Sequence, residues 1–338
     1  MMMERYSRQM LFSPIGEKGQ RVIQQKHVLI VGAGALGSAN ADMLARAGVG
    51  RLTIVDRDYV DWTNLQRQQL YSEEDADNRW PKAVAAKRRL ASVNHDVHVE
   101  ALVMDAQDES FASLFEQQID LIIDGTDNFE TRFLLNDLAQ KYRIPWIYGA
   151  CVGSYGLSFT IIPEQTPCFR CVMNHLPSYH LTCDNVGIIS PAVQMVAAYQ
   201  TTEALKILVG DVRAIRRSLV IFDVWQNEHR FLQVHKLKNE HCPSCGNDRI
   251  YPALRSERAK TSVLCGRDTV QIRHTHPFHI TNMMEQMKAN GQQVHGNEYL
   301  LMTQLEGHRV VLFADGRMLV HGTKDATFAR SLYQKYFS

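Results

Sequence analysis

A glycine-rich turn near the N-terminus constrains the fold of this chain more than any other feature. The run HVLIVGAG is short, apolar and ends in glycines, which is typical of a buried parallel strand. Gly32, Gly34 and Gly37 form a G-x-G-x-x-G pattern, and the residues ALGSANADMLARAGVG have helical spacing. A strand, a glycine turn and a helix in this order predict a nucleotide cradle, because glycines allow close backbone approach and a helix N-terminus attracts an anion.

Up to about residue 150, the chain alternates between expected strands and expected helices. The short apolar runs that predict further buried strands are RLTIVDRD, DVHVEALVMD, DLIIDGTDN and IPWIYGACVG. The segments with helical spacing are PKAVAAKRRLASVN, which has Pro at its start, QDESFASLFEQQ and FETRFLLNDLAQKYR. This alternation predicts an α/β fold with a Rossmann-like, doubly wound and mostly parallel sheet.

Beyond residue 150 the pattern changes, because strands follow one another with few helices between them. GLSFTIIP, SLVIFDVW and RFLQVHKL predict strands, and SPAVQMVAAYQTTEALKILVG predicts one long helix. We therefore expect an antiparallel extension of the same sheet. From about residue 262, the order β-α-β-β-α predicts a small α+β tail, in which GHRVVLFADGRMLVHG resembles a hairpin that turns at ADG.

Asp56 ends the strand after the glycine turn, about 20 residues downstream, where a carboxylate can bond ribose hydroxyls. The glycines and Asp56 by themselves fit NAD or FAD, another nucleotide, or glycines with a purely structural role. The choice between these ligands depends on the side chains that follow.

A set of polar residues downstream favours a triphosphate. Asn64 and Arg67, in DYVDWTNLQRQ, come just after the second strand, and Lys82 begins a helix. A nicotinamide has little use for several cations here, whereas the charge of a triphosphate must be neutralised before attack at phosphorus. Asp127, in DGTDN, is expected at the same edge of the sheet, where a carboxylate can hold Mg²⁺. Taken singly, each is better explained as a surface or turn residue, and only their joint placement favours ATP.

Four of the seven cysteines form two C-x-x-C pairs. Cys168 and Cys171 lie in PCFRC, and Cys242 and Cys245 lie in HCPSC. Two such pairs fit a tetrahedral zinc ion, and four sulfur ligands leave no open position for catalysis, so we expect a structural site. An iron–sulfur cluster and a redox or unligated role are the alternatives.

Composition excludes several classes of partner. The net charge of +1 argues against broad attraction to nucleic acid or to a membrane, although a local basic pocket remains compatible with it. The sequence has no run of 18 apolar residues and no apolar signal core at its start, so we expect a cytoplasmic protein without a membrane span. In that compartment disulfides are rare, which favours metal binding or thiol chemistry for the cysteines.

Together these motifs resemble the ThiF/MoeB branch of the ubiquitin-activating superfamily, the bacterial adenylyltransferases that activate ubiquitin-like sulfur carriers. The resemblance covers residues 4–250. The motifs that carry it, in chain order, are RYSRQ, GAGALGS, VDRDYVDWTNLQRQ, PKAVAA, DGTDN, PCFRC, TCDNVGIISP, TEALKILVG and CPSCG. Chance does not explain so many motifs in one order.

The resemblance implies a homodimer with one ATP site per subunit. The residues that it assigns to the nucleotide are Gly32, Gly34, Ala35, Gly37, Asp56, Asn64, Arg67, Lys82 and Asp127. Asp56 would bind the ribose, and Asp127 would serve the Mg²⁺ ion. Asn64, Arg67 and Lys82 would contact phosphates, and Arg67 and Lys82 would act in catalysis together with Asp127. Arg8, in RYSRQ, would reach into the site of the neighbouring subunit, a role that the sequence alone does not assign.

The implied reaction is attack by the C-terminal glycine carboxylate of a Gly-Gly-ended carrier on the α-phosphate of ATP. An acyl-adenylate forms and pyrophosphate leaves. No protein base is needed, because a carboxylate is already ionised at neutral pH, so positioning and charge neutralisation would supply the catalysis. The carrier belongs either to molybdopterin or to thiamine-thiazole synthesis; no motif separates them, and our slight preference for molybdopterin has no physical argument behind it.

The resemblance also divides the chain. An adenylation domain at residues 1–254 would contain a nucleotide-binding part at about 1–150 and a carrier-binding antiparallel part with the zinc site at about 151–254. A small α+β domain of unknown role would follow at 262–338, and it is too short for a rhodanese domain. Cys183, in LTCDNVGIISP, resembles the family cysteine that can form a thioester or acyl disulfide with the carrier; a tolerated loop cysteine is the alternative.

Three other functions remain as competitors. An activator acting on tRNA threonylcarbamoyladenosine is disfavoured, because such relatives generally lack the paired cysteine knuckles. An NAD oxidoreductase is disfavoured by Arg67, Lys82 and the lack of a hydride-transfer pair. A non-catalytic, zinc-stapled nucleotide-binding scaffold is disfavoured, because it would not need residues that neutralise phosphates. The residues that count against it are Asp56, Arg67, Lys82 and Asp127.

Overall fold

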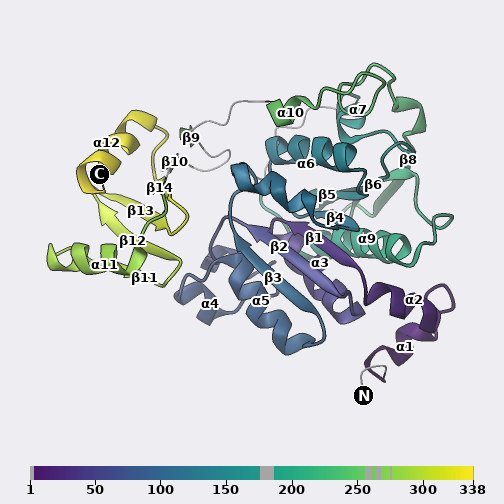
Figure 1. Ribbon diagram of the computed structural model, residues 1–338, viewed down its shortest axis with the longest axis horizontal. Helices are drawn as coiled ribbons and strands as arrows, with labels where there is room; N and C mark the ends of the chain where they lie inside the picture. The colour runs from purple at the N-terminus through teal and green to yellow at the C-terminus, as the bar shows by residue number, and fades with distance from the viewer. Residues whose placement is uncertain (1–3, 176–185, 256–260, 264–267, 275, 338) are drawn as a thin grey trace.

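The computed structural model describes residues 4–175, 186–255, 261–263, 268–274 and 276–337. Its strands form two sheets, one of eight strands and one of six, which lie side by side in Figure 1. None of the helices in this part of the chain is both long and apolar enough to span a membrane.

The eight-stranded sheet has the order β3-β2-β1-β4-β5-β6-β7-β8. Its strands are β1 (His27–Val31), β2 (Arg51–Asp56), β3 (His98–Val103), β4 (Leu121–Asp124), β5 (Trp146–Val152), β6 (Tyr155–Ile161), β7 (Ser218–Asp223) and β8 (Glu228–Gln233). In this order, β3, β2, β1, β4 and β5 pair in parallel. Strands β6, β7 and β8 continue the sheet in antiparallel pairing. The predicted Rossmann-like sheet with an antiparallel extension is confirmed.

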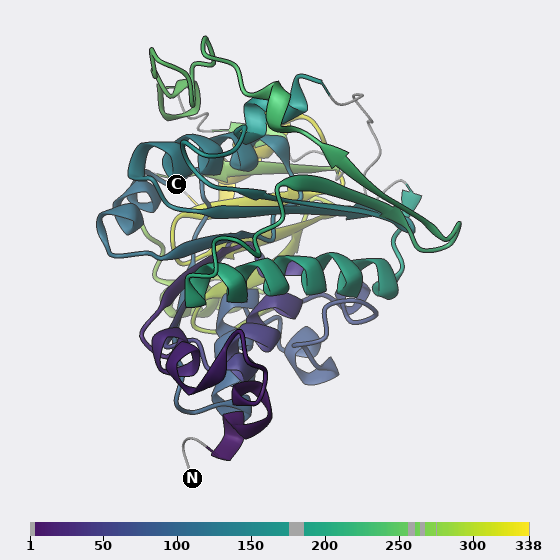
Figure 2. The ribbon, with the colours of Figure 1, turned by 90° about the vertical axis from the view of Figure 1, so that its right-hand side faces the viewer.

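Helices cover both faces of this sheet (Figure 2). In chain order they are η1 (Glu4–Tyr6), α1 (Ser7–Met10), α2 (Gly16–Ile23), α3 (Ala35–Ala47), η2 (Trp62–Asn64), α4 (Glu73–Asp77), α5 (Lys82–Val93), η3 (Glu109–Glu116), α6 (Phe129–Tyr142), α7 (Phe169–Met173), α9 (Ser190–Val209), η4 (His235–Leu237) and α10 (Pro252–Arg255). Alternate residues of β1 point to opposite sides: Val28 and Ile30 pack with α3, α5 and α9, whereas Leu29 and Val31 pack with α6 and η3. Both faces of β1 are therefore buried, which explains its continuous apolar run.

One predicted helix differs in type. The segment QDESFASLFEQQ forms the 3-10 helix η3 rather than an α-helix. It still buries Phe111 and Phe115 against the sheet, with their ring centroids 5.6 Å apart. The spacing therefore predicted a helical segment here, and the structure adds its 3-10 winding and its two buried rings.

The carboxyl ends of the central strands lie at one edge of the sheet. The parallel register places Val31 beside Val55 on β2 and beside Asp124 on β4. The loops after β1, β2 and β4 therefore leave the sheet next to one another, at the point where the strand order reverses direction. In open α/β sheets this is where ligands bind.

The second sheet is antiparallel and has the order β11-β12-β13-β14-β10-β9. Its strands are β9 (Thr261–Val263), β10 (Thr269–Arg273), β11 (Val294–Gly296), β12 (Leu300–Leu305), β13 (His308–Phe313) and β14 (Arg317–His321). The predicted hairpin is confirmed in β13 and β14, and its turn needs Gly316, whose φ is +92°. The predicted order of the tail had three strands, whereas this sheet has six. Strands β9 and β11 have three residues each, which are too few to establish an alternating pattern, and the longer β12 was not expected either.

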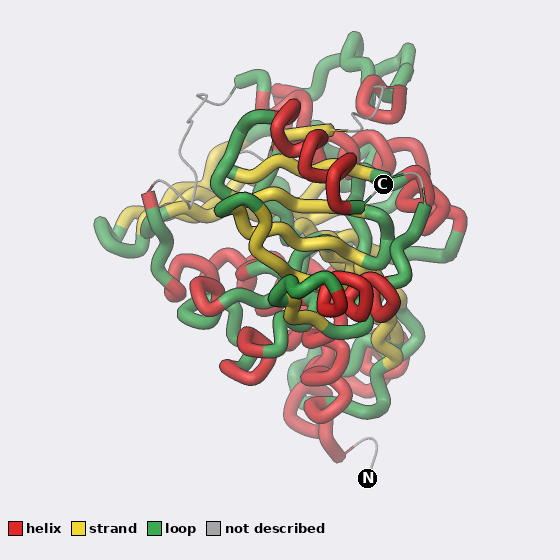
Figure 3. The backbone as a smooth tube through the Cα atoms, turned by 90° about the vertical axis from the view of Figure 1, so that its left-hand side faces the viewer, coloured by secondary structure: helices red, strands yellow, loops and turns green. Residues whose placement is uncertain are grey.

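Two helices, α11 (Ile280–Ala289) and α12 (Ala326–Tyr336), cover one face of the second sheet. Figure 3 shows this sheet and its helices on the side facing the viewer. The other face packs Leu300, Val311, Phe313 and Leu319 around Tyr59, which belongs to the loop after β2. We call this sheet with α11 and α12 the C-terminal unit.

Candidate functional site

The glycine-rich turn after β1 is packed against the end of β4. Gly32 has φ +88°, and its N–H donates to the carbonyl of Val55 at 2.7 Å. A Cβ at Gly32 would lie 2.6 Å from the carbonyl oxygen of Gly125, and a Cβ at Gly37 would lie 1.7 Å from that of Gly32. Both glycines are therefore required by packing within the chain itself.

Gly34 is different, because the chain leaves space around it. A Cβ at this position would meet only the carbonyl oxygen of Gly125, at 3.9 Å, and the φ of Gly34 is −72°. Helix α3 begins next to it at Ala35, and no side chain of the described residues caps the helix there. A glycine with open space at an uncapped helix N-terminus fits a backbone that a phosphate approaches closely.

Asp56 joins the end of β2 to the glycine-rich turn. Its Oδ2 accepts the backbone N–H of Ala33 at 2.6 Å, and its Oδ1 accepts that of Asp58, also at 2.6 Å. Burial raises the pKa of Asp56, and Lys82 works in the opposite direction. The carboxylate sits at the strand end where a ribose is bound in dinucleotide folds.

Lys82 reaches the same loop from the start of α5. Its backbone N–H donates to the carbonyl of Asp58 at 2.9 Å, and its Nζ lies 3.5 Å from Oδ2 of that residue. Lys82 is 5% exposed, so its ammonium group is largely excluded from solvent, and it acts electrostatically on Asp56. The structure thus places Asp56 and Lys82 at the same loop, next to the glycine-rich turn, and their roles stay predictions.

Asn64 and Arg67 lie on and just after η2. The Oδ1 of the buried Asn64 accepts the N–H of Asp61 at 3.1 Å, so this side chain already stabilises its own turn. Arg67 is half-buried, and its Nη1 donates to the carbonyl of Thr63 at 2.9 Å. Because a backbone carbonyl is a neutral partner, the positive charge of Arg67 is not cancelled by this bond.

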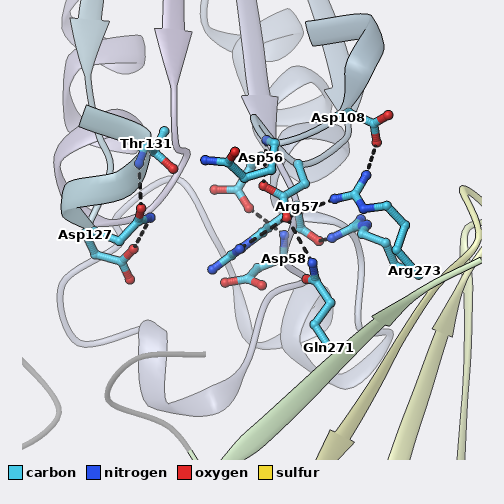
Figure 4. Close-up of polar contacts among 12 residues, drawn as sticks. Asp56, Arg57, Asp58, Asp108, Asp127, Thr131, Gln271 and Arg273 are labelled. Carbon is cyan, nitrogen blue, oxygen red and sulfur yellow. Dashed lines mark hydrogen bonds and ion pairs between the residues drawn. The ribbon is translucent and has the colours of Figure 1, made fainter. Parts of the chain in front are cut away.

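Asp127 is exposed in the loop between β4 and α6, where its Oδ1 lies 3.4 Å from Nδ2 of Asn128. Behind it, the buried Asp124 accepts Nε of Arg132 at 3.2 Å, and Arg132 also donates to the carbonyl of Thr126 at 2.6 Å. Burial raises the pKa of Asp124, although Arg132 opposes the shift. This buried pair fixes the loop that presents Asp127, and Figure 4 draws Asp127 to the left of the group around Asp56 and Asp58.

Arg8 lies far from the cradle of its own chain. It is exposed on α1, and the neighbouring Gln9 donates to the carbonyl of Ala47, at the C-terminal end of α3. The cradle is at the opposite end of α3, whose thirteen residues span about 20 Å. Arg8 therefore does not serve the site of the same subunit.

The four cysteines of the two C-x-x-C pairs form one buried cluster. Their sulfur atoms all lie within 4.8 Å of one another, with 3.7 Å between Cys168 and Cys242 and 3.6 Å between Cys171 and Cys245. Tetrahedral zinc with Zn–S bonds of about 2.3 Å places neighbouring sulfurs about 3.8 Å apart, so the cluster fits this ion. The second knuckle requires Gly246, because a Cβ there would lie 2.3 Å from the carbonyl of Glu240.

Comparison with known proteins agrees with this geometry. The model of the ThiF family matches residues 6–244, which is well over half of the chain. The chain belongs to the ThiF family.

Two curated relatives of this ThiF-family chain differ in how much of it they cover. It is 49% identical over 336 residues to the sulfur carrier protein ThiS adenylyltransferase of Bacillus subtilis, covering 98% of each chain. It is 34% identical over 253 residues to a sulfur carrier protein adenylyltransferase of Thermus thermophilus, covering 73% of this chain and 92% of the relative. Among solved structures, that of Escherichia coli MccB aligns with TM-score 0.63 at 21% identity over 73% of each chain, which supports the fold alone.

Cys183, the predicted thiol intermediate, lies outside the described residues. Its role stays a prediction.

Reasoning from the sequence missed three side chains of the site. Asp58 is the partner of Lys82, Arg132 is the partner of Asp124, and Arg57 pairs with Asp105 after β3 at 3.3 Å. Arg57 and Asp58 directly follow Asp56, so their position was available in the sequence. Their partners, Asp105 and Lys82, come from distant segments, and no local sequence pattern predicts such pairs.

Proposed function

We propose that this ThiF-family protein adenylates the C-terminal glycine carboxylate of a ubiquitin-like sulfur carrier, with ATP as the adenylyl donor. The observation that carries the proposal is the 49% identity, over 98% of each chain, to an enzyme named as a ThiS adenylyltransferase. The arrangement of Gly34, Asp56, Lys82 and Asp127 at one edge of the sheet supports it.

The first task of the site is to hold the nucleotide. The ribose would bind to Asp56, whose orientation is fixed by the N–H groups of Ala33 and Asp58. The phosphates would lie over the open backbone at Gly34 and the N-terminus of α3, next to Ala35. Because the turn is rigidly packed at Gly32 and Gly37, the cradle needs little rearrangement on binding.

The second task is to neutralise charge as the α-phosphate is attacked. The carrier carboxylate forms a bond to the α-phosphorus while the bond to pyrophosphate breaks, so negative charge builds up on the leaving group. Lys82 and Arg67 would supply the positive charge for this role, and Asn64 would contribute its amide. In the absence of nucleotide Lys82 is held by Asp58, which keeps its ammonium in position.

The metals have separate roles. Asp127 would hold Mg²⁺ at the phosphates, because an exposed carboxylate at this edge suits an ion that keeps several waters. When bound, the ion would supply further charge neutralisation. Zinc would be held by Cys168, Cys171, Cys242 and Cys245, and it would fix the segment after η4 to the start of α7.

We further propose that the protein acts as a homodimer in which Arg8 completes the site of the partner subunit. The support is the position of Arg8 at the far end of α3 from its own cradle. An exposed arginine at that place has no task in its own site.

For the carrier, we propose a ThiS-type protein of thiamine-thiazole synthesis. The support is the name of the Bacillus subtilis relative, which matches the full length of the chain including the C-terminal unit. This departs from our slight preference for molybdopterin, which had no physical argument.

The test is the intact mass of each candidate carrier after incubation with this protein, ATP and Mg²⁺. We expect a ThiS-type carrier to gain one adenylyl group, and a carrier lacking its terminal glycine to gain none. If a molybdopterin-synthase carrier is modified instead, the pathway assignment is wrong. If ATP binds and no carrier is modified, the proposed reaction is wrong.

A further inference from the structure

The C-terminal unit docks at the edge of the larger sheet that carries the glycine-rich turn. The face of its sheet that α11 and α12 leave free packs around Tyr59, which lies three residues after Asp56 in the chain. Arg317, which is 1% exposed, donates from Nη1 to the carbonyl of Arg57 at 2.8 Å. The loop that begins at Asp56 is therefore held by the cradle on one side and by the C-terminal unit on the other (Figure 4).

Asp105 is the point where the C-terminal unit meets the side chain of Arg57. Its Oδ2 accepts Nη1 of Arg57 at 3.3 Å and Nε2 of Gln271 at 3.1 Å, and lies 3.2 Å from Nη2 of Arg273. Burial works to raise the pKa of Asp105, but Arg57 and Arg317 outweigh it, so the net shift is downward. The carboxylate stays ionised, and residues of β10 set its orientation.

Arg273 fixes this junction from a second direction. Its Nη1 donates to Oδ2 of Asp108 at 2.5 Å, so the guanidinium bridges two carboxylates that follow β3. Figure 4 shows Gln271 and Arg273 reaching from the C-terminal sheet toward Arg57. The contact with Asp108 is a charge-assisted hydrogen bond, and the contact with Asp105 is an ion pair. Because a guanidinium presents its donors in a fixed plane, the first bond restricts the orientation of the group that faces Asp105.

Arg57 itself lies among the carboxylates of the candidate site. Burial disfavours its charged form, but Asp105, Asp58 and Asp127 outweigh burial and raise its pKa. It directly follows Asp56, at the strand end where the nucleoside rather than the phosphates is bound in doubly wound sheets. A half-buried guanidinium at this place can contact the ribose or stack on the base.

We propose that Arg57 is a further nucleotide-binding residue at the nucleoside end of the site, and that Gln271 and Arg273 of the C-terminal unit position it through Asp105. This inference rests on the proposed ATP-dependent function. The inference assigns a role to the C-terminal unit, because its residues would position a side chain that contacts the nucleotide.

The test compares the binding of ATP and of AMP to the full-length protein by calorimetric titration, without a carrier. We expect Arg57→Met and Arg273→Met each to weaken ATP about tenfold, in line with the loss of a charged hydrogen bond. AMP should weaken by the same factor, because both ligands share the nucleoside. Lys82→Ala, at the phosphate end, should weaken ATP much more than AMP.

Three further variants separate positioning from general damage. The double variant Arg57→Met/Arg273→Met should bind no more weakly than Arg57→Met alone, because Arg273 acts through Arg57. Arg273→Lys should restore part of the affinity, since an ammonium still pairs with Asp105. Arg330→Met, on the exposed side of α12, should bind both ligands like the wild type.

Asn297→Ala is the control for a contact between the C-terminal unit and the rest of the chain that does not involve Arg57 or Asp105. Its Nδ2 donates to the carbonyls of Asn78 and Arg79 at 3.0 and 3.3 Å, which are contacts to the larger sheet's domain away from Asp105. This variant should keep its affinity within about twofold, as expected for a substitution without a contact to the site.

The inference is overturned if Arg273→Met and Arg57→Met bind ATP like the wild type while remaining folded by circular dichroism. It is also overturned if ATP weakens and AMP does not, because Arg57 would then act at the phosphates. A wild-type protein that binds neither ligand would instead overturn the proposed function itself. The two failures are therefore distinguishable.

Discussion

Oδ2 of Asp56 accepts the backbone N–H of Ala33 at 2.6 Å, so the end of β2 is tied directly to the glycine-rich turn after β1. The same carboxylate accepts the N–H of Asp58 with its other oxygen. One side chain therefore orders both loops that form the nucleotide cradle, and it does so before any ligand binds.

Replacing Asp56 by asparagine should damage both binding and stability. Asparagine offers one acceptor oxygen for two N–H donors, so one of them is left without a partner, at a cost of about 1–3 kcal/mol. We expect ATP affinity to fall at least about tenfold, since the ribose also loses its carboxylate. Denaturant unfolding and nucleotide titration measure the two effects. Asp42→Asn, which removes a surface pair with Arg46, is the control and should change neither.

Arg67→Ala and Lys82→Ala should lose adenylation while the fold is kept. Both remove a positive charge at the phosphates, and such electrostatic contributions are worth about a hundredfold or more in rate. Carrier-dependent ATP–pyrophosphate exchange is the measurement. Lys87→Ala, an exposed lysine on the same helix as Lys82, is the matched control. Unchanged exchange in both site variants would refute the assignment of these residues.

Cys168→Ser should release the metal and destabilise the protein. The cluster holds four sulfur atoms within 4.8 Å, and losing one ligand of a structural zinc removes folding free energy of about 4 kcal/mol or more. Metal analysis should give one zinc per wild-type chain and little in the variant. Cys151→Ser changes a half-buried cysteine of β5 outside the cluster, and it should keep its zinc. A metal-free wild type with unchanged stability would contradict this prediction.

His27 should make the protein less stable as the solution is acidified. Burial lowers its pKa, followed by the effects of the Gln118 carbonyl, Glu100 and Asp120, which raise it, and of Arg51, which lowers it. The folded state therefore favours the neutral ring. The stabilising contribution is present above the ordinary value of 6.5 and is lost as the pH falls through the folded-state pKa.

The measurement for His27 is the free energy of unfolding at pH 8 and at pH 5.5. The wild type should lose more stability between these two pH values than His27→Gln, whose side chain does not titrate. His95→Gln, at an exposed position, should keep the wild-type pH dependence. Equal losses in the wild type and His27→Gln would show that folding does not lower the pKa of His27, and would contradict this prediction.

The sequence by itself determined the glycine-rich turn, the alternation of strands and helices in the parallel half and the four cysteines of the cluster. These features follow from short-range rules: β1 is apolar because both of its faces are buried, and Gly32 and Gly37 are glycines because the backbone leaves no space for a Cβ. The C-x-x-C spacing already sets two sulfur ligands within reach of one ion. Such patterns can be recognised from neighbouring residues alone, without knowing which remote segments pack against them.

Only the tertiary structure decided what lies against the cradle. Lys82 faces Asp58, Arg132 faces Asp124, and Gln271 and Arg273 meet Arg57 through Asp105. An apolar or charged pattern says which face of a strand is buried, but not which remote segment buries it. The place where β10 and β14 dock depends on the shape and charge of a surface that exists only after the larger sheet has formed.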